Sequence, residues 1–70
     1  MSPKVIARDA ACPGGTCPTT YEHPDPAMAY VQGYLVTDPN ARAEFNLPEG
    51  EGLLAVPNTL LADHVRAMQA

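Results

Sequence analysis

The sequence has few aromatic and few basic residues. It contains no tryptophan, one phenylalanine and three tyrosines, and its four lysines and arginines face eight aspartates and glutamates in 70 residues. The shortage of large apolar residues predicts a single domain with a small core, of the kind that rarely supplies more than ~3–5 kcal/mol. The net charge of −4 argues against direct nucleic-acid binding, because that affinity depends on Lys and Arg meeting phosphates.

Long apolar runs are also missing. No stretch approaches the ~18 residues that a membrane-spanning helix requires. The first residues lack the extended apolar segment of a secretory signal. We therefore expect no membrane association and a cytoplasmic location.

The best strand in the chain is residues 29–37. It is rich in tyrosine, valine and leucine, which fit a pleated surface. Alternation gives it two faces, one with Tyr30, Gln32, Tyr34 and Val36 and the other with Val31, Gly33 and Leu35. A glycine inside a strand indicates a bulge or a close approach. We expect the second face to form the core, with a helix crossing at Gly33, and the tyrosine face to be only partly covered.

The remaining elements follow from turn and cap signals. Residues 19–22 form a strand, and the proline-bearing loop after them predicts an antiparallel hairpin over residues 19–37. Asp38 and Pro39 predict the start of a short helix, with Asn46 in a left-handed position after it. Residues 53–56 form the third strand. Residues 57–68 form an amphipathic helix capped by Asn58 or Thr59.

These elements predict an α+β fold. We expect a small three-stranded, mainly antiparallel sheet with a short middle helix, and a C-terminal amphipathic helix packed on one face. Residues 1–16 are expected to be a flexible N-terminal arm, although residues 4–7 could form a short edge strand, and residues 17–70 to be the single domain. The expected core consists of Val31, Leu35, Phe45, Leu54, Val56, Leu61, Val65 and Met68.

The candidates for site chemistry are two cysteines and two histidines. Cys12, Cys17, His23 and His64 would together make a tetrahedral zinc set. The alternatives are two unpaired thiols, one of them buried, or a disulfide, which a reducing cytoplasm disfavours. A catalytic pair of Cys17 and His23 is disfavoured, because a reactive thiolate needs an electropositive setting and the neighbours are acidic. We expect no enzyme activity, no metal and no cofactor.

The tyrosine face is the candidate binding surface. Tyr30, Gln32 and Tyr34 would present aromatic rings around a polar centre, with Tyr21 beside them, and this composition is typical of interfaces. We expect acidic flanks from Glu22, Asp25 and Glu44, which would favour a partner with a basic surface. The sequence predicts a protein-interaction module. The alternatives are a small zinc-binding domain and a self-associating dimer that uses the tyrosine face.

Several segments carry a resemblance. They are Cys-Pro-Thr-Thr-Tyr (17–21), Val-Gln-Gly-Tyr-Leu-Val-Thr-Asp-Pro (31–39), Leu-Pro-Glu-Gly-Glu (47–51) and a hydrophobic strand that ends in Val-Pro (56–57). In this order they resemble small uncharacterised proteins of actinobacteria, similar in plan to the BldB-like short regulator-partner proteins, which are often encoded beside helix-turn-helix regulators. The resemblance implies a regulatory or protein-binding role, with a DNA-binding regulator as partner. It implies no residue-level function.

Overall fold

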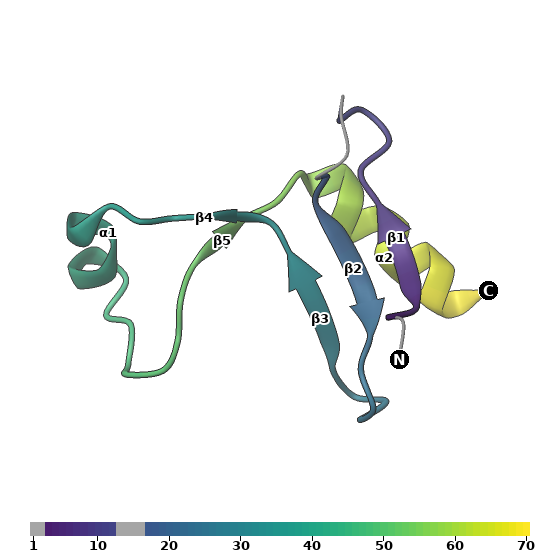
Figure 1. Cartoon of the computed structure of the whole chain (residues 1–70), viewed down its shortest axis with the longest axis horizontal. Helices are drawn as coiled ribbons and strands as arrows, with labels where there is room; N and C mark the ends of the chain where they lie inside the picture. The colour runs from purple at the N-terminus through teal and green to yellow at the C-terminus, as the bar shows by residue number, and fades with distance from the viewer. Residues whose placement is uncertain (1–2, 13–16) are drawn as a thin grey trace.

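The computed structural model describes residues 3–12 and 17–70 and shows an α+β domain (Figure 1). Its elements are β1 (Val5–Arg8), β2 (Thr19–Glu22), β3 (Ala29–Gln32), β4 (Tyr34–Leu35), α1 (Pro39–Glu44), β5 (Leu54–Ala55) and α2 (Asn58–Gln69). The first three strands form an antiparallel sheet in the order β1-β2-β3, and α2 packs on one face of it, mainly against β1. The predicted fold class is therefore confirmed.

The hairpin of β2 and β3 forms as the sequence predicts. Its register places Thr19 opposite Gln32 and Glu22 opposite Ala29. The loop holds itself through Asp25, whose Oδ1 accepts from the backbone N–H of Ala27 at 2.9 Å. This Asx-type bond gives the proline-bearing loop a defined path between the two strands.

The N-terminal boundary of the domain differs from the prediction. β1 pairs with β2, so residues that the sequence assigned to a flexible arm of residues 1–16 belong to the sheet. Only the possible edge strand at residues 4–7 anticipated this. The pairing shifts register between Val5 and Ala7, and there the Ala7 N–H donates to the Thr20 hydroxyl at 3.1 Å. Residues 1–2 and 13–16 of the predicted arm lie outside the described residues.

Gly33 ends β3 and starts a second, separate ribbon. A Cβ atom at this position would lie 2.5 Å from Val56 Cγ1 and 3.0 Å from the Ala55 carbonyl oxygen. The predicted close approach is confirmed, but the end of β5 makes it rather than a helix. Because β5 pairs with β4 alone, residues 53–56 do not join the main sheet, and the expectation of one sheet with this third strand is wrong.

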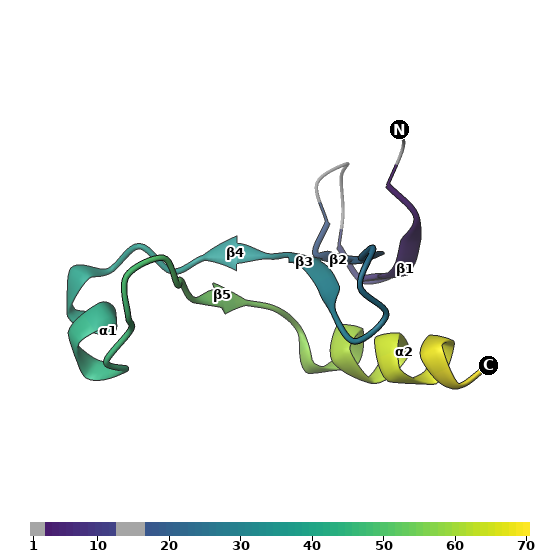
Figure 2. The ribbon, with the colours of Figure 1, turned by 90° about the horizontal axis from the view of Figure 1, so that it is seen from below.

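The β4–β5 ribbon and α1 form a projection, which we define as residues 34–55. It extends from the sheet in the direction opposite to α2 (Figure 2). Asp38 caps α1, as predicted, by accepting from the Asn40 N–H at 3.0 Å, and Asn46 takes a positive φ of 52°. Arg42 closes the tip by donating to the Glu51 carbonyl oxygen at 2.9 Å.

The buried centre lies between α2 and the sheet, and it is smaller than predicted. Leu60 is fully buried, and the other buried residues are Ala7, Cys17, Pro18, Thr19 and Thr20. Of the expected core, Val56 is half-buried, and Val31, Leu35, Phe45, Leu54, Leu61, Val65 and Met68 are exposed. The core prediction is therefore wrong.

Two causes explain this difference. First, α2 turns Leu60 and His64 toward the sheet, so the stripe of Leu61, Val65 and Met68 lies on the flank of the helix. Second, the apolar residues of the projection leave the sheet altogether. The start of α2 also differs, because Pro57 occupies the N-cap position without a side-chain hydrogen bond, in place of Asn58 or Thr59.

Candidate functional site

The predicted binding residues all lie at the surface, on two different strands. Tyr30 and Gln32 belong to β3, and Tyr34 belongs to β4. The two tyrosines are 53% and 57% exposed, and Gln32 is also exposed. All three residues are therefore exposed, and the break at Gly33 places Tyr34 in a different sheet from Tyr30 and Gln32.

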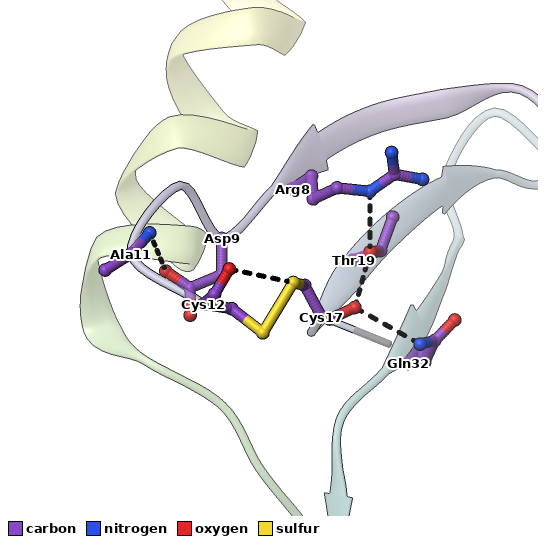
Figure 3. Close-up of a disulfide and its surroundings, with 7 residues drawn as sticks. All are labelled: Arg8, Asp9, Ala11, Cys12, Cys17, Thr19 and Gln32. Atoms are coloured by element: carbon purple, nitrogen blue, oxygen red, sulfur yellow. Dashed lines mark hydrogen bonds between the residues drawn. A yellow bond between two sulfur atoms is a disulfide. The ribbon is translucent and has the colours of Figure 1, made fainter. Parts of the chain in front are cut away.

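Gln32 is held in place from both ends of its amide. Its Oε1 accepts from the Tyr21 hydroxyl at 2.9 Å. Its Nε2 donates to the Cys17 carbonyl oxygen at 3.2 Å, as Figure 3 shows. Cys17 is buried, so the second bond ties an exposed side chain to a fixed point of the core. One N–H and one acceptor lone pair of the amide remain for another group.

The two tyrosines lie on either side of this amide. Gln32 and Tyr34 line a shallow hollow of about 240 Å³ together with Pro18 and Gly33. Tyr30 is the cross-strand partner of Tyr21 on β2, and its ring contacts the ring of His23 at a centroid distance of 4.5 Å. Of these contacts, the sequence indicated the aromatic patch with Tyr21. It gave no signal for the Cys17 anchor or for the histidine contact.

The three acids that the sequence predicts as flanks lie in three different places. Glu22 lies on the opposite face from Tyr21 by strand alternation and forms an ion pair with Lys4 at 3.4 Å. Asp25 lies in the hairpin loop, and Glu44 lies at the tip of the projection. The charged residue beside Thr19 on this face is instead Arg8, whose Nε donates to the Thr19 hydroxyl at 3.4 Å (Figure 3). The expectation of acidic flanks is therefore wrong for Glu22 and Glu44, whereas the Asp25 N–H donates at 2.9 Å to Nδ1 of His23, whose ring contacts Tyr30.

The four residues of the zinc alternative do not form a common site in this structure. Cys12 and Cys17 form a disulfide (Figure 3), with Cα atoms 5.6 Å apart, so neither sulfur is a thiolate ligand. His23 contacts Tyr30, and His64 Nδ1 lies 2.8 Å from the Thr20 hydroxyl. Within residues 3–12 and 17–70, no cluster of three or more His, Cys, Asp or Glu side chains could hold a metal ion. The same disulfide leaves no nucleophile for a pair of Cys17 and His23.

A second hollow lies beside α2, and the sequence gave no direct signal for it. It measures about 390 Å³ and lies between the C-terminal half of α2, the start of β1 and the β2–β3 loop. Met28 and Met68 supply its apolar lining, and Lys4 and Glu22 supply its charged side. The only hint was the apolar stripe of α2, which the spacing identified and assigned to the core.

Comparison of the chain with protein-family models, with curated proteins and with solved structures gives no match. The described part of the chain contains no helix with the length and apolar character needed to cross a membrane.

Proposed function

We propose that this chain is a protein-interaction module that binds a partner protein through Tyr30, Gln32 and Tyr34. The observation that carries the proposal is an anchored glutamine amide between two aromatic side chains that are more than half exposed. Exposed aromatic residues around a polar centre are typical of binding surfaces.

The anchoring of Gln32 supports this role, because a fixed side chain loses less conformational freedom on binding. Immobilising a flexible side chain at an interface costs about 0.5–1.5 kcal/mol. Here the Tyr21 and Cys17 bonds hold the amide in the free protein. The hollow beside Tyr34 gives room for one side chain of a partner.

The partner that we propose is a DNA-binding regulator of the helix-turn-helix class. Two points support it: the net charge of −4 favours encounter with a basic surface, and the resemblance to BldB-like proteins implies such a partner. In this proposal the chain is an accessory protein and not an enzyme, and it contacts the regulator rather than the nucleic acid. The negative charge that favours such a partner belongs to the whole molecule rather than to a ring of acids around the tyrosines.

The test is affinity capture from the host lysate with the wild-type chain and with Tyr30→Ala/Tyr34→Ala, followed by quantitative mass spectrometry. A helix-turn-helix protein should be enriched by the wild type and lost with the double variant. With that regulator purified, the double variant should weaken binding at least tenfold. The matched control is Phe45→Ala, an exposed apolar residue at the end of α1, which should bind as the wild type does.

Two results would contradict the proposal. One is equal capture of the same partner by the wild type and by the double variant. The other is loss of the far-UV circular dichroism spectrum of the double variant, which would make at least one of the two tyrosines structural.

A further inference from the structure

We propose that this chain forms a symmetric dimer in which the projection of each copy packs on the α2 flank of the other. The surfaces are the Leu35/Leu54 side of the β4–β5 ribbon and the stripe of Leu61, Val65 and Met68. This interface is separate from the tyrosine face, because Leu35 and Tyr34 point to opposite sides of β4.

The single chain exposes too much surface for its mass. A compact monomer of 7.4 kDa has an accessible area of about 4,200 Å², and this chain has 5509 Å². Its radius of gyration is 13.5 Å, against about 11 Å for a compact chain of 70 residues. The excess of about 1,300 Å² per chain corresponds to about 2,600 Å² for a pair, which falls in the range of obligate dimers.

Exposed apolar side chains form two groups away from the tyrosine face. Leu35 and Leu54 are direct partners across the ribbon, so they share one side of it, and Leu35 is 67% exposed. On α2, residues 61, 65 and 68 follow the i, i+4, i+7 spacing of one helix face, and Val65 is 53% exposed. A monomeric protein rarely leaves two such surfaces open.

The shape of the chain selects a second copy as the occupant. The projection leaves one side of the sheet, and α2 runs beneath the sheet in the opposite direction (Figure 2), so they do not cover each other within one chain. A twofold axis between them reverses one copy and brings each projection alongside the α2 of the other. One closed, isologous arrangement then covers both open surfaces of both copies.

Charge favours this pairing over contact between the two projections. The projection carries Arg42 against Asp38, Glu44, Glu49 and Glu51, for a net charge of −3. The rest of the described chain carries Lys4, Arg8 and Arg66 against Asp9, Glu22, Asp25 and Asp63, for −1. Two projections side by side would repel each other more strongly than a projection placed on the body of the other copy.

The test is sedimentation equilibrium of the full chain and of two variants, Leu35→Asp and Val65→Lys. The wild type should sediment at twice 7.4 kDa, and each variant alone should raise the dimer dissociation constant at least tenfold. An equimolar mixture of the two variants should restore a dimer, since one interface is then unchanged and the other joins opposite charges. If a variant loses its circular dichroism spectrum when alone, recovery of that spectrum on mixing supports the same conclusion.

Three outcomes would overturn the proposal. The wild type could remain a monomer up to millimolar concentration, either variant alone could dimerise as tightly as the wild type, or the mixture of the two variants could form no heterodimer. The last outcome, with dissociation by Leu35→Asp alone, would indicate contact between the two projections. The matched control is Tyr30→Ala, which should sediment as the wild type. A dimer lost with Tyr30→Ala would instead place the interface on the tyrosine face, so this test separates failure of the dimer from failure of the proposed function.

Discussion

Replacing Thr20 with valine should destabilise the domain although the two side chains have nearly the same shape. Thr20 is 1% exposed, and its hydroxyl accepts from the Ala7 N–H at 3.1 Å and lies 2.8 Å from His64 Nδ1. The register shift in β1 makes this hydroxyl the acceptor for the Ala7 N–H. Valine would leave that buried N–H without an acceptor, at a cost of about 1–3 kcal/mol.

The control is Thr20→Ser, which keeps the hydroxyl and removes one methyl group. Urea unfolding followed by circular dichroism gives both free energies, with all chains at one protein concentration because dimer formation would make stability concentration-dependent. We expect Thr20→Val to be less stable than Thr20→Ser. Valine at least as stable as serine would show that the bonds to Ala7 and His64 contribute no more than the methyl group that serine lacks.

Other substitutions test the remaining contacts. Leu60→Ala should lower the unfolding free energy by ~2–5 kcal/mol. Leu61→Ala should lower it less, because Leu60 is 0% and Leu61 46% exposed. Equal urea midpoints for the two variants would refute the orientation of the helix. Gly33→Ala should destabilise the root of the projection through the Val56 contact, whereas Gly52→Ala has no atom within 4 Å of its new Cβ and should be nearly neutral in the same assay. Reduction of the disulfide should lower the unfolding free energy by about 2 kcal/mol, and an unchanged midpoint in reductant would contradict this. A chelator should leave the far-UV spectrum unchanged, and its loss would restore the zinc alternative.

The sequence predicts the elements that depend on neighbouring residues. Asp38 and Pro39 start α1 because cap and first-turn preferences act within a few residues. Asn46 follows for the same reason, since it tolerates a positive φ. The β2–β3 hairpin follows from two strand-like segments joined by a proline-bearing loop.

The wrong predictions concern features that depend on contacts between residues far apart in the sequence. Leu60 and Leu61 are adjacent and identical in type, and only the position of the sheet decides which of them is buried. Gly33 indicates a close approach, but no local signal says whether a helix or β5 makes it. The pairing of Leu54 with Leu35, away from the main sheet, is a long-range choice of the same kind.

The candidate site was predicted in part. Tyr30 and Tyr34 could be placed at the surface, because a chain with one long helix leaves one sheet face open. The Cys17 carbonyl that anchors Gln32 depends on the main-chain path after the disulfide, and residue types do not encode that path. The disulfide itself was one of several alternatives, since spacing alone does not set the redox state of two cysteines.

The most direct test of the account is an isotope-filtered nuclear Overhauser measurement on an equal mixture of labelled and unlabelled chains. The central claim is that the apolar side chains exposed by one chain are covered by another protein chain. We expect contacts between copies from the Leu35 and Leu54 methyl groups to the Val65 methyl groups. The claim would be contradicted if, at millimolar concentration, these methyl groups showed contacts within one copy only and Leu35 and Leu54 were exposed to solvent.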